Sequence, residues 1–316
     1  MSLKARVFIV NNIKLPIHAS IKEAFSVARK RLAKAGIPSE NAKLFVYRKS
    51  VDARRKNDIR FVYSVAASGE FAKISEPALK NNDISVSDIQ SLSEITFGDK
   101  PMSAPPLIVG AGPAGLFAAL ILAENGYSPI LIERGGSVEE RKKLVLQFNS
   151  TQILDTDTNI QFGAGGAGTF SDGKLVTRIN DPISSYVLQR LVDFGAPEEI
   201  LYLARPHIGT DILAPVIERI ILEIERLGGR VHYHTKYIDT KVKSGVTVAL
   251  TSKGEIPYGA LILAVGHSAR DTYKTLIEAG YNIEAKPFSV GMRIEHLADN
   301  IDRVMYGDFL RLVYFP

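Results

Sequence analysis

The stretch VGAGPAGLFAAL, Val109–Leu120, decides the fold. It follows a short apolar segment that predicts a strand, and it opens a run that predicts a helix closed by Gly126. Its glycines with G-x-G-x-x-G spacing are Gly110, Gly112 and Gly115. The first permits a tight turn, the second lets the backbone approach a diphosphate, and the third lets the helix pack closely on the sheet. Pro113 and Ala114 begin the helix, whose positive dipole end favours the same anion. The stretch predicts a βαβ unit that binds a dinucleotide.

A carboxylate ends the next predicted strand, 129–133, roughly twenty residues after the glycines. Glu133 can accept hydrogen bonds from ribose hydroxyls at that position. A carboxylate there also disfavours a ribose 2′-phosphate, and Arg134 beside it is a further candidate contact. The fingerprint alone leaves open whether the dinucleotide is NAD or FAD.

A second glycine-rich segment, 159–175, reads NIQFGAGGAGTFSDGKL. Its glycines are Gly163, Gly165, Gly166, Gly168 and Gly173, and Lys174 follows them. So many glycines exclude a regular helix or strand interior and predict a loop whose backbone approaches a ligand closely. Successive free N–H groups in such a loop bind anions. One glycine loop suffices for NAD, whereas two suit the longer FAD molecule.

Two further segments hold candidate contacts to substrate or flavin. The apolar segment 260–265 predicts a strand that ends at Gly266 and His267, and ligands of open α/β sheets bind beyond the C-terminal ends of strands. Arg205 and His207 precede a predicted helix, 211–227, for which Thr210 or Asp211 is the expected N-cap.

The first 96 residues predict a small α+β domain that precedes the nucleotide-binding one. Short strands are expected at 7–10, 44–47 and 59–65, and a helix is expected from the Ser20-x-x-Glu23 capping box. Residues 71–96 are weakly patterned. We expect domain 1–96, a Gly/Pro/Ser-rich linker 97–106, and an α/β domain 107–316 that carries a β-rich insertion and the start of a substrate domain.

Composition narrows the function classes. The 316 residues include no cysteine, which excludes thiolate metal sites and redox-active disulfides, and no metal site is expected. The uncharged run 101–123 contains several prolines and glycines, so we predict no membrane span. No leader precedes the first predicted strand, and a cytoplasmic location is expected.

Charge is unevenly divided between the two parts of the chain. Residues 1–100 carry 18 basic and 10 acidic side chains, or +8, while the remainder carries 21 and 24, or −3. The basic residues Arg48, Lys49, Arg54, Arg55, Lys56 and Arg60 lie beside the aromatic residues Tyr47, Phe61 and Tyr63. Basic side chains interleaved with aromatics can bind single-stranded nucleic acid, although most charged runs are solvated faces.

Four strings together closely resemble a family of bacterial FAD-dependent dehydrogenases, or NAD(P)/FAD-dependent oxidoreductases, whose substrate is largely unassigned. They are GAGPAGLFAA, QFGAGGAGTFSDGKL, ARPHIGTD and FSVGMRIEH. The resemblance covers nearly the whole chain and implies a flavoprotein fold with two dinucleotide-binding domains. It also implies noncovalent FAD, with diphosphate on 110–115, ribose on Glu133 and loop 163–173 beside the flavin. Members of that family continue beyond the equivalent of Pro316, so the chain is expected to be truncated relative to them.

The sequence therefore predicts a flavin-dependent oxidoreductase that transfers hydride between the flavin and a small-molecule substrate, with NAD(P)H as a candidate electron donor. The catalytic residues are not identified. One alternative is an NAD-dependent dehydrogenase that uses the first loop alone. Another is a nonenzymatic binding module whose basic N-terminal domain recognises RNA or an acidic protein, although nucleic acid is not the expected partner.

Overall fold

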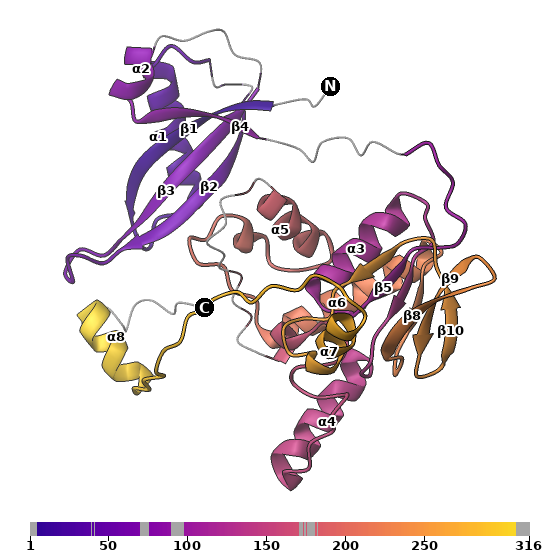
Figure 1. Ribbon diagram of the computed structural model, residues 1–316. Helices are drawn as coiled ribbons and strands as arrows, with labels where there is room; N and C mark the ends of the chain where they lie inside the picture. Colours follow the sequence, from indigo (N-terminus) through magenta and orange to yellow (C-terminus); the bar gives the residue numbers. More distant parts are fainter. Residues whose placement is uncertain are drawn as a thin grey trace.

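The computed structural model describes residues 5–38, 40, 42–69, 76–89, 98–170, 173, 175, 181 and 183–307. They form an N-terminal domain built on one antiparallel sheet and a larger domain built on a parallel sheet (Figure 1). None of the helices in these ranges is long and apolar enough to cross a membrane.

The N-terminal domain has six elements in the order βαββαβ. They are β1 (Ala5–Pro16), α1 (Ile21–Lys34), β2 (Lys43–Asp52), β3 (Arg60–Ser68), α2 (Glu76–Asn81) and β4 (Ile84–Ile89). The sheet order β2-β3-β1-β4, with all pairs antiparallel, is that of a ferredoxin-like split βαβ unit. The first four elements match the predicted βαββ order. Neither α2 nor β4 was predicted, because the apolar pattern of 71–96 is weak.

Helix α1 covers one face of this sheet. Its start is the predicted capping box, in which the Ser20 backbone N–H donates to Glu23 at 2.9 Å. Ala24, Ala28 and Leu32 recur at helical spacing and are fully buried against the sheet. Local capping and burial therefore specify the same helix.

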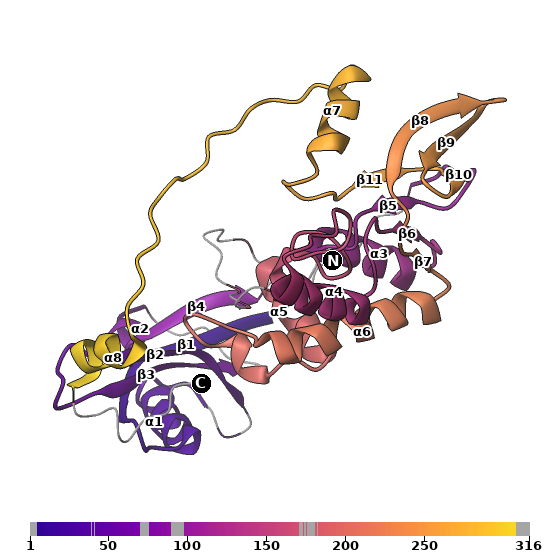
Figure 2. The same cartoon turned by 90° about the horizontal axis from the view of Figure 1, so that it is seen from below.

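The parallel sheet is the centre of the larger domain, and it confirms the predicted α/β class. Its order is β11-β5-β6-β7, and these strands are β5 (Leu107–Val109), β6 (Ile130–Ile132), β7 (Arg230–His232) and β11 (Leu261–Leu263). Helices α3 (Pro113–Glu124) and α6 (Thr210–Arg226) pack on one face. The predicted β-rich insertion forms a three-stranded antiparallel sheet on the other face: β8 (Tyr237–Lys243), β9 (Val246–Thr251) and β10 (Gly254–Pro257) (Figure 2).

Several elements of this domain were not predicted. They are α4 (Val138–Thr151), η1 (Ala167–Phe170), α5 (Ile183–Asp193), η2 (Glu198–Leu201), α7 (Arg270–Glu278) and α8 (Ala298–Tyr306). The expected N-cap of α6 was also wrong: Gly209 occupies that position, and Thr210 is the first helical residue. Gly209 has no side chain that could cap the helix. Thr210 and Asp211, the polar residues that suggested the N-cap, lie inside the first turn.

The two domains meet at the edge of β2. The backbone N–H of Lys49 donates to the Tyr202 carbonyl at 2.7 Å, and the Ala204 N–H donates to the Lys49 carbonyl at 3.0 Å. This forms a parallel bridge between Lys49 and Leu203. A segment of the larger domain therefore pairs with an edge strand of the N-terminal sheet.

Candidate functional site

The first glycine loop is shaped by the absence of side chains. Gly110 follows β5 with φ +102°, and a Cβ there would lie 2.5 Å from the Ala264 carbonyl oxygen. A Cβ on Gly115, in the first turn of α3, would overlap the Gly110 carbonyl oxygen. Only glycine fits both positions, so the tight turn and the close helix contact expected from the spacing are present.

The second glycine loop packs directly against the first. The Gly165 N–H donates to the Ala111 carbonyl at 2.8 Å. A Cβ on Gly166, where φ is +69°, would lie 3.1 Å from both Gly112 Cα and Pro113 Cδ. The two loops, separate in sequence, therefore form one surface at the N-terminus of α3.

The glycines of the second loop differ in how closely other atoms pack against them. A Cβ on Gly168 would meet no atom within 4 Å. Gly173 lies at the far end of the loop, where its carbonyl accepts from the Ile208 N–H at 2.9 Å. Lys174, a predicted substrate or flavin contact, lies outside the described residues.

A buried cation supports the second loop, and the sequence analysis missed it. Arg141 of α4 is fully buried, and its guanidinium lies 4.5 Å from the Phe170 ring centre. Among the described residues its acceptors are all backbone carbonyls, at 2.5–3.3 Å: those of Asn159, Ile160, Gly163, Ala164 and Gly166. Burial lowers the pKa of Arg141 to about 10, so the side chain stays charged at neutral pH. No spacing rule separates this arginine from the basic residues that follow it.

Glu133 joins the two loops from the end of β6. The side chain is 5% exposed, and its carboxylate accepts from the N–H groups of Ala111 at 2.8 Å, Gly135 at 2.9 Å and Gly163 at 3.2 Å. A carboxylate has about four lone-pair sites, so one acceptor site is left toward the cleft that Glu133 lines. The ribose contact stays a prediction, and the structure adds this second role.

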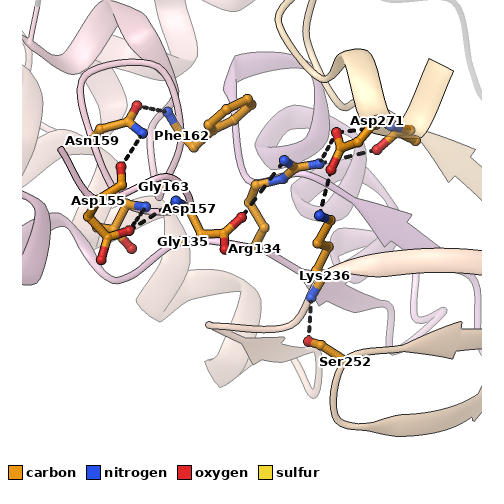
Figure 3. Close-up of polar contacts among 12 residues, drawn as sticks. Arg134, Gly135, Asp155, Asp157, Asn159, Phe162, Gly163, Lys236, Ser252 and Asp271 are labelled. Atoms are coloured by element: carbon orange, nitrogen blue, oxygen red, sulfur yellow. Dashed lines mark hydrogen bonds and ion pairs between the residues drawn. The ribbon is translucent and has the colours of Figure 1, made fainter. Parts of the chain in front are cut away.

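Arg134 lies in an ion-pair network that links β6 to α7 and β8 (Figure 3). Its guanidinium stacks 4.5 Å from the Phe162 ring centre and donates to Asp271 at 3.0 Å and to the Thr272 hydroxyl at 3.2 Å. Lys236 lies 2.6 Å from the other oxygen of Asp271. Since Arg134 is already paired, it is not a free partner for a ribose 2′-phosphate.

Asp271 is charged in this network. Burial favours its neutral form, but hydrogen bonds from Arg134, Lys236 and the Thr272 N–H outweigh that effect and hold its pKa well below the usual range. Asp271 therefore fastens α7 beside the cleft at neutral pH.

The two loops and the ends of β5 and β11 surround a cleft of about 340 Å³. The predicted residues that line it are Gly110, Gly112, Pro113, Ala114, Glu133, Arg134, Gly163, Gly166, Gly266 and His267. Gly115 and Gly165 do not line the cleft. Each lies under the loops, where a Cβ would collide with a neighbouring atom. His267 is exposed at the cleft, with its Nε2 3.4 Å from the Ser268 hydroxyl.

Arg205 and His207 are not brought to this cleft. Both are exposed, and they lie on the segment that follows the contact with β2. The same segment pairs with the end of the second loop, because the Leu175 N–H donates to the Pro206 carbonyl at 3.1 Å. It thus connects the N-terminal sheet to the second glycine loop.

The residues present fit a dinucleotide diphosphate and an adenosine. The N-terminus of α3 carries no acidic residue in its first turn and faces the cleft through Gly112, Pro113 and Ala114. Leu263, Val265 and Leu276 supply apolar walls. The site therefore combines a helix N-terminus for an anion with an apolar pocket for a ring system.

Comparisons with known proteins agree with this geometry. Residues 103–156 match the family described as FAD binding domain, and residues 9–68 match a domain of unknown function, DUF8436. The cofactor is therefore FAD. The glycine spacing alone had left open whether the dinucleotide is NAD or FAD. An uncharacterized protein of Clostridium beijerinckii is 41% identical over 302 residues, which are 95% of this chain and 56% of that protein. The chain thus spans about half the length of this relative.

Two of the solved structures that match this chain are distant from it. THI4 from Thermovibrio ammonificans is 18% identical over 57% of this chain and 64% of its own, with a TM-score of 0.36. Glycine oxidase from Geobacillus kaustophilus is 15% identical over 56% and 59%, with a TM-score of 0.30. These superpositions are too loose to support any inference about this chain.

Proposed function

We propose that this chain is the FAD-binding part of a flavin-dependent oxidoreductase that transfers hydride between the flavin and a small molecule. The observation that carries the proposal is the contact between the two glycine loops at the N-terminus of α3. The first of these loops lies within the segment 103–156 that matches an FAD binding domain. When bound, FAD supplies the two-electron chemistry, and the protein supplies binding, orientation and electrostatics.

The cleft suggests a role for each group of residues. Gly112, Ala114 and Gly166 present backbone to the diphosphate, and Glu133 keeps one acceptor site for the adenosine ribose. The Arg134–Phe162 stack forms a flat wall of the cleft against which an adenine can pack. His267 is the predicted polar side chain that stays exposed at the cleft, and we propose it as a contact of the flavin or the substrate.

Direct titration with FAD tests this proposal. FAD fluorescence should be quenched on addition of the purified chain, and Gly112→Val should remove the quenching because a branched side chain would point toward Gly166. Gly168→Ala is the matched control, since a methyl group there meets nothing within 4 Å. Unchanged fluorescence with the wild-type chain would contradict the proposal, and tighter binding of NAD than of FAD would favour a dehydrogenase that uses the first loop alone.

The structure gives less support to a nucleic-acid-binding module. Phe61 and Tyr63 pack in the core between the sheet and α1, so they offer no stacking surface, and Lys49 lies 4.0 Å from the Phe61 ring centre. Arg54 and Arg60 are paired with Asp52 and Asp58. The aromatic and basic residues that suggested this alternative are thus largely engaged with one another or with carboxylates.

A further inference from the structure

The face of the N-terminal sheet opposite α1 carries a hydrogen-bonded polar row. The Ser64 hydroxyl of β3 donates to Asn11 Oδ1 of β1 at 2.9 Å, and Asn11 Nδ2 donates to the Ser85 hydroxyl of β4 at 3.0 Å. Asn11 lies in the irregular part of β1, between the paired residues Val10 and Ile13, where Asn12 has φ +55°. A bulge of this kind re-aims side chains and often lies beside a functional site.

A hollow of about 670 Å³ lies over this row. Its lining is mainly polar and comes from all four strands and α2: Asn11, Asn12, Arg48, Ser50, Val62, Ser64, Lys80, Asp83, Ile84 and Ser85. Because Ser85 accepts from Asn11, its own hydroxyl hydrogen can donate to a ligand, as can that of Ser50.

The cations of the hollow are not neutralised. The side chains of Arg48 and Lys80 make no hydrogen bond or ion pair with any residue that the structure describes. Asp83 is the carboxylate in the lining, and Arg31 lies 3.4 Å from it. Arg31 also donates to the backbone carbonyl of Asn11 at 2.7 Å, so it fixes the bulge from behind. The hollow therefore has an excess of positive charge with hydroxyl donors between the two free cations.

The strand order places those cations on either side of the row. Arg48 lies on β2 and Lys80 lies just before β4, and these strands are the two edges of the sheet. Three inter-strand spacings separate the edges, roughly 14 Å, which two long side chains can partly span. A compact anion over Ser64 and Asn11 is within reach of both.

We infer that this hollow is a second ligand site, which binds a small polyanion such as a phosphorylated metabolite. Guanidinium and ammonium groups with hydroxyl donors between them are the usual partners of phosphoryl oxygens. A single-stranded nucleic acid is disfavoured, because the β3 aromatics Phe61 and Tyr63 lie on the opposite face, toward α1. The site is separate from the cofactor cleft and does not depend on the proposed redox function.

Calorimetric titration of the whole chain with inorganic tripolyphosphate tests the inference. The titration is done with saturating FAD, so that the glycine loops are not available to the probe, and at low salt. We expect binding that Arg48→Gln and Lys80→Gln each weaken by about fivefold or more, in line with the loss of a charge-assisted contact. Arg55→Gln is the control, because Arg55 is an exposed cation on the connection between β2 and β3 but does not line the hollow.

Three results would overturn the inference. They are no binding of tripolyphosphate to the wild-type chain, an equal loss in the Arg55→Gln control, and tighter binding of an oligouridylate with the same dependence on Arg48. All the substituted side chains are exposed, so the variants should fold, and circular dichroism spectra and thermal melts that match the wild type would show that they do.

Discussion

The two glycine loops line the same cofactor cleft, but different interactions hold each of them in place. The first, at 110–115, is shaped mainly by the strand and helix on either side of it and by the absence of side chains, with one hydrogen bond from the Ala111 N–H to Glu133. The second, at 163–168, contains little regular structure and is held by side chains from elsewhere, above all Arg141 and Glu133. The difference shows why the first loop can be recognised from spacing and the second only in part.

The largest loss of stability is expected at Gly115, where the first loop leaves no room for a side-chain atom. Gly115→Ala places a methyl group on the Gly110 carbonyl and 3.3 Å from Ile108 Cγ2, both in the packed core of the sheet. We expect a loss of more than about 4 kcal/mol of unfolding free energy, the range of severe core overpacking. Thermal melts followed by circular dichroism would measure this, and a variant as stable as the wild type would show that the helix can shift away from the strand.

Removing Arg141 should have the next largest effect and should act on the second loop. Arg141→Met keeps the apolar stem but leaves carbonyls of 159–166 without a donor, which we expect to cost about 3–5 kcal/mol. Urea denaturation would measure the change in unfolding free energy. Lys142→Met, at the adjacent exposed position, is the control and should differ from wild type by less than about 0.5 kcal/mol. Equal stability of the two variants would mean that the loop holds its shape without the buried cation.

The second loop should also respond to acid through Asp271. This carboxylate holds Arg134 against Phe162, the residue that precedes Gly163. Because its pKa is lower in the folded chain than in the unfolded one, it stabilises the fold above the unfolded pKa, and this contribution is lost as pH falls below about 4. Asp271→Asn should therefore be less stable than wild type at pH 6, by no more than about 1 kcal/mol since Asp271 is partly exposed.

Denaturation of both proteins across pH 3–7 would check this. The difference in unfolding free energy should begin to narrow below about pH 4, near the unfolded pKa of the carboxyl, and only part of it should be gone at pH 3, because the pKa of folded Asp271 lies well below that value. A difference that stays constant over the whole range would show that Asp271 acts through packing and not through its charge.

The smallest effect is expected at Gly168, where the second loop has open space. Gly168→Ala should change the unfolding free energy by less than about 0.5 kcal/mol and leave the FAD dissociation constant unchanged. A marked loss of FAD affinity in the same titration would mean that the ligand approaches this residue closely, and the division of the second loop into tight and open parts would be wrong.

The sequence predicted those parts of the molecule that local rules specify. The Gly110–Gly115 spacing, the Ser20–Glu23 capping box and the order of strands around the βαβ unit follow from backbone geometry and periodicity. Two glycine-rich loops were expected to suit one long dinucleotide, and the structure places them in contact. Arg141 could not be found in this way, since its role depends on a loop twenty residues away folding over it.

Contacts between residues far apart in the sequence also account for the other residues that sequence patterns did not identify. The pairing of Arg134 with Asp271 joins positions 137 residues apart, and neither residue has a spacing that marks the other. Arg205 and His207 were singled out because no local rule accounts for them, yet the structure places them where the second loop meets the contact to β2. Long-range pairing, which a single sequence does not encode in any local pattern, decides all of these positions.

The central claim is that the two loops bind one diphosphate together. The most direct test is a double-mutant cycle in which FAD affinity is measured for wild type, Gly112→Ala, Gly166→Ala and the double variant by fluorescence titration. The two substitutions should be coupled, with an interaction energy of about 1 kcal/mol or more, because a methyl group on either glycine would face the other loop across the same narrow gap. Strictly additive effects would contradict this claim. So would a loss of FAD affinity in Gly112→Ala with no loss in Gly166→Ala.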